Sequence, residues 1–513
     1  MKSKTKFVFN MLLGLLLLFG VGIYSLAKLS EQPVSMNMAN MPSGKHDMQQ
    51  MSSSGISVTK LTEDTVESPV KTFDLTAEEA VIDIGNGKTI QAWTFNGTVP
   101  GPEIRVQEGD RVIVHVKNTL KEGVTIHWHG VELPNAEDGV AGVTQDAIPP
   151  GSDFTYNFIA KHAGTYWYHS HQESEKETGK GLYGAFIVET KHPTTVYQRE
   201  IVSILHEWDR STFTVDGTSL GAKYAAKPGD LVLLRLINSG DATYNMTLTG
   251  SPFLVSAIDA HDINEPTELN ERIIEIGSGQ RYDLVFRMPE SSGVKLVNVD
   301  KNEKQSNIVK RLFFTSSSTA KNRMLQATFG DGEVTGNVNV LAQQPFFDMT
   351  TYGSPVLQGN DPLSINAKFD AQYDLTLGNM LGFFNGVFTM KFTINGQTFP
   401  NIPMLIVKKG DWVRIHIQNN SPDNDHPIHL HGHSFKVLTH NGEPLSGSPI
   451  YLSTILVKPQ ESYDIAFVAD NPGLWMIHCH ILGHAANGMD MMVNYEGVST
   501  PYSVGSKSGN RPD

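Results

Sequence analysis

The chain has 513 residues, with 40 Lys or Arg against 54 Asp or Glu, so its formal net charge is −14. This acidic balance excludes the basic face that nucleic-acid binding requires, and the length allows about three domains. Cys479 is the only cysteine, which excludes an internal disulfide.

The N-terminal segment predicts export. Lys2, Lys4 and Lys6 precede an apolar run from Phe7 to Ala27. A run of about 20 apolar residues is long enough to cross a bilayer as a helix, and a basic start followed by an apolar run is also typical of a signal peptide. We therefore predict a signal peptide or N-terminal membrane anchor over residues 1–30. The protein is then extracellular or in the cell envelope, with cleavage left open.

Residues 31–55 are polar and are predicted to form a disordered linker. This linker contains several thioethers and one imidazole, at Met36, Met38, Met41, His46, Met48 and Met51. Thioethers are soft ligands that suit Cu(I), although a plain tether explains the composition equally well. At the other end of the chain, residues 503–513 are predicted to be a flexible tail.

The body of the chain repeats three times. The segments "EIRVQEGDRVIVHVKNTL", "KYAAKPGDLVLLRLINSG" and "MLIVKKGDWVRIHIQNNS" each contain a Gly-Asp turn and then alternate apolar and polar residues. Such alternation indicates a half-buried strand. We predict an all-β protein of three units over residues 56–191, 192–335 and 336–502. Each unit should be a Greek-key sandwich or barrel.

Four short histidine strings stand at matching points of the first and third units. They contain the pairs His127/His129, His169/His171, His429/His431 and His478/His480. On a strand, both imidazoles of an H-x-H string point to one face. If the first unit faces the third, eight imidazoles converge on one cavity, a donor set that suits copper, zinc, iron or nickel. The middle unit has "NVD" (298–300) at the corresponding place and is predicted to be a spacer in the chemistry.

Cys479 stands between two of these histidines and points to the opposite face of its strand. A thiolate, two imidazoles and a weak axial thioether form the ligand set of a blue copper centre. His426, His484 and Met489 are the available partners. Met491 and Met492 are alternatives to Met489 for the axial position. The thiol and its neighbours would thus serve two adjacent metal sites.

The four strings resemble the copper motifs of the multicopper oxidases, in particular the three-domain bacterial laccase-like and cuprous oxidase-like enzymes. The resemblance runs from about residue 80 to 495 and includes "WTFNGTVPGP" at 93–102. It implies three cupredoxin-like domains and four copper ions. The implied ligands are His426, Cys479, His484 and Met489 for type 1, His127 and His429 for type 2, and His129, His169, His480 with His171, His431, His478 for the type 3 pair.

The resemblance also implies a reaction. A small reducing substrate, a phenol, an aromatic amine or Cu(I), gives single electrons to the type 1 copper, and Cys479 passes them on to the cluster that reduces dioxygen to water. Asp138 matches the family's proton-relay acid, whereas Ala485 stands where many bacterial relatives have a second acid. We expect a monomer that serves copper tolerance. The alternatives are a copper-storage protein without turnover and a nitrite reductase, and the full set of eight imidazoles argues against the latter.

Overall fold

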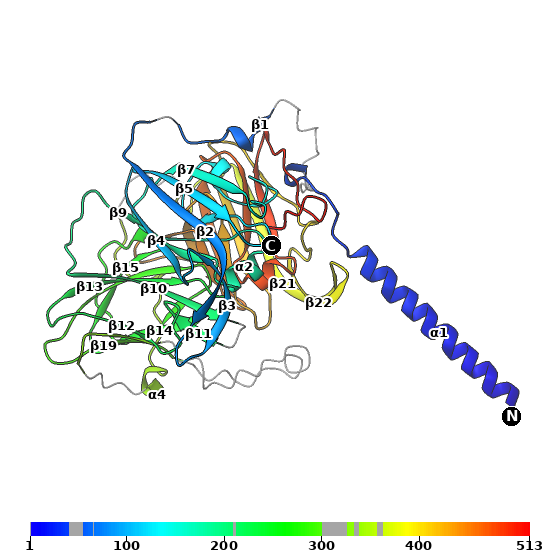
Figure 1. Cartoon of the computed structure of the whole chain (residues 1–513), viewed down its shortest axis with the longest axis horizontal. Coiled ribbons are helices and arrows are strands. Elements are labelled where there is room, and N and C mark those ends of the chain that lie inside the picture. Colours follow the sequence, from blue (N-terminus) through cyan, green and yellow to red (C-terminus); the bar gives the residue numbers. More distant parts are fainter. Residues whose placement is uncertain are drawn as a thin grey trace.

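The computed structural model describes residues 2–40, 55–64, 66–208, 212–299, 326–332, 338–356 and 363–512. The body consists of β-sheets arranged as three successive two-sheet units (Figure 1). The prediction of an all-β fold is confirmed. The described helices outside the leader are short: α2 (Ser174–Gly179), α4 (Val338–Leu341) and α5 (Leu482–Ala485).

The first unit packs the sheet β3-β2-β5-β7 against the sheet β4-β9-β8-β6. Its strands are β2 (Val70–Asp83), β3 (Thr89–Phe95), β4 (Gly101–Gln107), β5 (Arg111–Asn118), β6 (His127–His129), β7 (Asp153–Ile159), β8 (Gly164–His169) and β9 (Tyr183–Glu189).

The second unit has the sheets β11-β10-β13-β18-β15-β16 and β12-β20-β19-β14-β17. Its strands are β10 (Arg199–Trp208), β11 (Thr212–Val215), β12 (Ala222–Tyr224), β13 (Leu231–Asn238), β14 (Tyr244–Thr249), β15 (Phe253–Ile258), β16 (His261–Asp262), β17 (Ile274–Ile276), β18 (Arg281–Arg287), β19 (Val294–Asn298) and β20 (Gln326–Phe329).

The third unit has the sheets β22-β21-β24-β30-β26-β27, with β28 beside β26, and β23-β32-β31-β25-β29. Its strands are β21 (Ala371–Phe384), β22 (Val387–Ile394), β23 (Leu405–Val407), β24 (Trp412–Asn419), β25 (His426–Leu430), β26 (Phe435–His440), β27 (Glu443–Pro444), β28 (Tyr451–Leu452), β29 (Thr454–Val457), β30 (Ser462–Val468), β31 (Leu474–Cys479) and β32 (Asp490–Tyr495). Strand β1 (Ile56–Ser57) pairs in parallel with β33 (Val498–Ser499).

The Gly-Asp turns have the same local structure in all three units. Gly109 has φ 78°, a left-handed conformation that favours glycine. The Asp110 carboxylate accepts a hydrogen bond from the Gln107 N–H at 2.9 Å. Asp230 and Asp411 accept in the same way from the N–H three residues earlier. Each turn is followed by the predicted strand, which is β5, β13 and β24 in turn.

The leader forms helix α1 (Lys2–Leu29), whose segment Phe9–Leu29 is long and apolar enough to cross a membrane. Figure 1 shows α1 projecting away from the body.

The prediction of disorder is wrong for residues 31–40 and for the C-terminal tail. Met36 and Val504 exchange backbone hydrogen bonds at 2.8 Å, Met38 is buried, and Asn510 is 1% exposed. Composition missed this order because the two polar segments satisfy each other's backbone groups. The rest of the methionine-containing linker, with Met41, His46, Met48 and Met51, lies outside the described residues.

Candidate metal centres

Strand pairing aligns the histidine strings within each terminal unit. In the first unit His127 lies opposite His169, and in the third unit His429 lies opposite His478. The two units then face each other, so that the His127 and His429 Nε2 atoms are 3.4 Å apart although 302 positions separate them in the chain. All eight imidazoles of the four strings are buried. The structure therefore brings this predicted set together.

The outer nitrogens of several of these rings are held by oxygen atoms. The Nδ1 atoms of His169, His429 and His478 lie 2.8–3.1 Å from main-chain carbonyl oxygens. An Nδ1–H that donates to a carbonyl fixes the tautomer in which Nε2 keeps its lone pair. The Nε2 atoms of these three rings therefore keep a lone pair that can bind a metal ion.

Several other ring nitrogens of these eight histidines are buried and have no hydrogen-bond partner among the described residues. They are Nδ1 of His129, Nε2 of His169, both ring nitrogens of His171 and Nε2 of His480. Buried polar atoms are normally paired, so unpaired nitrogens that converge indicate a bound cation. Burial, followed by the neighbouring imidazoles, lowers the pKa of His429 and His431 well below the usual value. The rings are therefore neutral at pH 7, as metal ligands must be.

Three sets of nitrogens in this group lie within 4.8 Å of one another. They are His171/His431/His478, His127/His129/His169 and His127/His429/His431. The first set coincides with one predicted type 3 site. The ring of His480, predicted for the other type 3 site, has its centroid 4.7 Å from that of His129.

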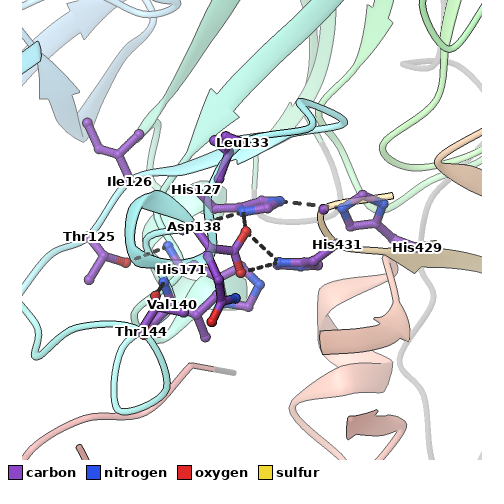
Figure 2. A network of polar contacts seen from close by, with 12 residues as sticks. Thr125, Ile126, His127, Leu133, Asp138, Val140, Thr144, His171, His429 and His431 are labelled. Atoms are coloured by element: carbon purple, nitrogen blue, oxygen red, sulfur yellow. Dashed lines mark hydrogen bonds and ion pairs between the residues drawn. The ribbon is translucent and has the colours of Figure 1, made fainter. Parts of the chain in front are cut away.

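Asp138 connects two of these rings from outside (Figure 2). Its carboxylate lies 3.0 Å from Nδ1 of His431 and 3.2 Å from Nδ1 of His127, and its main-chain carbonyl lies 2.9 Å from the same His127 atom. Gly139 follows with φ 75°, and a Cβ atom there would collide with the carbonyl of Ile126. This glycine therefore lets the acidic loop pass close behind the His127 strand.

The thiol of Cys479 lies on the face of β31 opposite to the ring of its neighbour His478. Its Sγ atom is 3.6 Å from Nδ1 of both His426 and His484, and these two nitrogens are 3.3 Å apart. Trigonal bonds of about 2.0 Å to nitrogen and about 2.3 Å to sulfur would place the donors about 3.5–3.7 Å apart. The three donors thus fit one metal ion. The remaining His426 nitrogen is held by the Ser421 hydroxyl at 2.9 Å.

Met489 is tied to this group through its main chain. Its carbonyl accepts the Cys479 N–H at 3.1 Å, and its N–H donates to the His484 carbonyl at 3.1 Å. Met491 and Met492 pair instead with Ile477 and Met476 along β32. Met489, which is fully buried, therefore has the closest backbone connection to the thiol group.

The middle unit contacts the eight histidines of the four strings, which we call the inner histidine group. This contact was not predicted from the sequence. The Ser278 hydroxyl donates to the His480 carbonyl at 2.7 Å and lies 3.0 Å from Nδ1 of His480. A Cβ atom on Gly279 (φ 81°) would come within 2.9 Å of the rings of both His129 and His480. The only sequence signal for this contact was the position of "IGSGQRYD" in the repeat.

Thr454 of the third unit was also missed. Its hydroxyl lies 3.0 Å from Nε2 of His129 and 3.1 Å from Nδ1 of His429. It therefore links rings from the first and third units. Its β29 position carries no recognisable motif, so only the tertiary contact identifies it.

Comparison with known proteins agrees with this arrangement. Multicopper oxidase family models match residues 76–193 and 369–497. Laccase-1 of Botryotinia fuckeliana is 30% identical, over 77% of this chain and 77% of its own length. The chain is a multicopper oxidase. Multicopper oxidase MmcO of Mycobacterium tuberculosis is 27% identical, over 83% and 87%.

Solved structures give the same result for this multicopper oxidase. The enzyme from Pseudomonas thermotolerans matches with a TM-score of 0.64 and 27% identity, covering 84% of this chain and 100% of that one. The laccase from Botrytis aclada matches with a TM-score of 0.66 and 25% identity, covering 85% and 89%. The fold is therefore three cupredoxin-like domains. The enzyme binds four copper ions of types 1, 2 and 3 and couples oxidation of a reducing substrate to reduction of dioxygen.

Proposed function

We propose that the outer donor group, His426, Cys479, His484 and Met489, is the type 1 site where substrate electrons enter. The inner group then divides as the family pattern implies: His127 and His429 for type 2, with His129, His169, His480 and His171, His431, His478 for type 3. The single observation that carries this proposal is the 3.3–3.6 Å triangle of one sulfur and two nitrogens beside the inner histidines.

Copper, when bound, supplies one-electron chemistry at the outer group and the reduction of dioxygen at the inner one. The chain itself provides the connection between them. Cys479 faces the outer group, whereas its neighbours His478 and His480 face the inner one, so only a few covalent bonds separate sulfur from imidazole. Asp138 orients His127 and His431 and is placed to hold a proton beside them. No acid stands at Ala485.

The substrate proposal rests on access to His484, the partly exposed member of the outer group. A cavity of about 370 Å³ is lined by Ala485 and Ala486, the residues directly after His484, and by both acidic and basic side chains, among them Glu173, Lys176 and Arg511. Phe384 and Phe399 in the same lining offer apolar surface that suits a small aromatic donor. We assign phenols and aromatic amines as the main substrates, in line with the laccases among the relatives.

Cu(I) is a second candidate substrate, and its oxidation would serve copper tolerance. The observation that favours it is the methionine-containing linker at residues 31–55, because thioethers are soft ligands that suit Cu(I). A related structure from Campylobacter jejuni is described as a metallo-oxidase.

We further propose that the enzyme is exported as a monomer and stays attached to a membrane through α1. The 21-residue segment Phe9–Leu29 supports attachment. The three lysines before it would remain on the cytoplasmic side by the positive-inside rule. The catalytic body then lies outside the cytoplasmic membrane.

Oxygen uptake by the purified, copper-loaded enzyme tests the substrate proposal. We expect uptake with a methoxyphenol and with Cu(I), both in proportion to copper content. Turnover of Cu(I) without any phenol oxidation would overturn the phenol assignment, and the reverse result would overturn the copper role. A copper-depleted sample is the control.

A further inference from the structure

The hairpin of β21 and β22 exposes an unusual number of large apolar side chains. Met380, Leu381, Val387 and Phe388 are 44%, 43%, 63% and 56% exposed, and we call these four residues the apolar tip. An Asn-Gly turn at 385–386, with both residues at positive φ, closes the hairpin. Clustered exposed apolar side chains mark a contact with a protein or a membrane.

The first unit contains an equivalent hairpin, β2–β3, whose side chains can be compared with the apolar tip. Asn96 accepts from the Thr76 N–H at 2.6 Å, and Asn395 accepts from the Thr376 N–H at 2.7 Å. The two hairpins are thus anchored at equivalent positions. The β2–β3 hairpin is more polar and charged, however, with Glu78, Glu79, Asp83 and Lys88, and over its paired residues 77–95 Val81 is the one exposed large apolar side chain. An apolar tip is therefore not needed to form the hairpin.

The two hairpins also differ in what contacts their ends. The second unit meets the β2–β3 end: the Ser219 N–H donates to the Ile84 carbonyl at 2.8 Å, and Lys88 donates to Thr212 at 2.6 Å. The β21–β22 turn instead meets the residues that follow α1.

Three hydrogen bonds join this turn to the end of α1. The Asn385 N–H donates to the Ser30 carbonyl at 2.9 Å, and the Gly386 N–H donates to the Ser30 hydroxyl at 3.0 Å. The Gln32 N–H donates to Asn385 Oδ1 at 3.4 Å. Figure 1 shows β22 beside the base of α1. The hairpin is therefore held next to the point where the apolar helix ends.

We propose that the apolar tip lies in the outer interface of the bilayer that α1 crosses. An α-helix rises 1.5 Å per residue, so the apolar segment of α1 spans about 31 Å, the thickness of the hydrocarbon core. Its end at Leu29 then lies at the membrane surface, and the β21–β22 turn, which is hydrogen-bonded to Ser30, holds the apolar tip near the same depth. Interfacial contact of apolar side chains with lipid is favourable. This proposal rests on the proposed retention of α1 as an anchor.

Such a contact would also orient the substrate cavity. Strand β22 continues to Phe392, whose ring stacks on His484 at a centroid distance of 3.7 Å. Phe384 and Asn385 line the same cavity as Ala485. A tip seated in lipid would therefore place the entrance to the type 1 site at the membrane surface.

The test uses the full-length, copper-loaded enzyme in phosphatidylcholine vesicles. The native Cys479 is buried, so Val387→Cys can be labelled selectively with a polarity-sensitive fluorophore. Val81→Cys is the matched control, because Val81 is 60% exposed on the equivalent hairpin. We expect a blue-shifted emission that nitroxide-labelled lipids quench at position 387, and a water-like, unquenched emission at position 81.

Water-like emission without quenching at both positions, in protein that floats with the vesicles, would overturn the apolar-tip proposal while leaving the anchor intact. Protein with an intact N-terminus that fails to float would overturn the anchor and the tip together. Oxygen uptake with a phenol, measured on the same samples, reports separately on the oxidase assignment.

Discussion

The outer and inner donor groups share strand β31 and differ in construction. The outer group comes from the third unit alone, contains the thiol of Cys479, and has a partly exposed ring at His484. The inner group needs two units, consists of imidazoles, and is closed to solvent. The two groups therefore differ in solvent access although they lie within a few residues of each other. This difference suits the proposed roles, in which electrons enter at the outer group and dioxygen is reduced at the inner one.

The largest effect should come from the residue that joins the two groups. Cys479→Ser removes the sulfur ligand and the covalent connection at once, so turnover with phenols and Cu(I) should fall below detection. The inner imidazoles remain, so part of the copper should stay bound. Visible absorption, copper analysis and oxygen uptake check this result. Retained turnover would show that the two groups do not work in series.

Asp138→Asn should affect the inner group and spare the outer one. The amide replaces one of the two carboxylate oxygens beside His127 and His431 with an NH2 group, which cannot accept from an Nδ1–H, and it cannot hold the relay proton. Changes to groups that orient metal ligands typically cost about 10–100-fold. We expect reoxidation by dioxygen to slow by that factor while type 1 reduction is unchanged, as measured by stopped-flow absorption.

The control for Asp138→Asn is Glu137→Gln. Glu137 is the preceding acid, but its carboxylate accepts from the Asn157 N–H at 2.9 Å and does not contact the rings. The Glu137→Gln variant should leave both type 1 reduction and reoxidation by dioxygen unchanged. Equal slowing of both half-reactions by Asp138→Asn would remove the relay role.

The smallest effect should come from Met489→Leu. Loss of a weak axial thioether should keep the copper in place and raise the type 1 reduction potential, because the axial ligand tunes it. Redox titration of the blue absorption measures the shift. Met491→Leu and Met492→Leu are matched buried controls that should leave the potential unchanged. A shift in one of these controls instead would reassign the axial ligand.

The amino-acid sequence by itself determined the local chemistry. Period-2 alternation after Gly-Asp turns predicted β5, β13 and β24, because strand alternation is a local property of the chain. The spacing in "HSH" and "HCH" predicted which face of a strand each ligand occupies. The assignment of each donor to a copper site came from the resemblance to the multicopper oxidases.

Only the tertiary structure decided how the units meet. Ser278, Gly279 and Thr454 border the inner histidines through contacts between units, and no pattern around them signals a metal site. Composition likewise failed for residues 31–40 and for the tail, since their order comes from pairing with each other. The physical reason is that docking depends on surfaces built from residues hundreds of positions apart, whereas sequence periodicity reports only on neighbours along the chain.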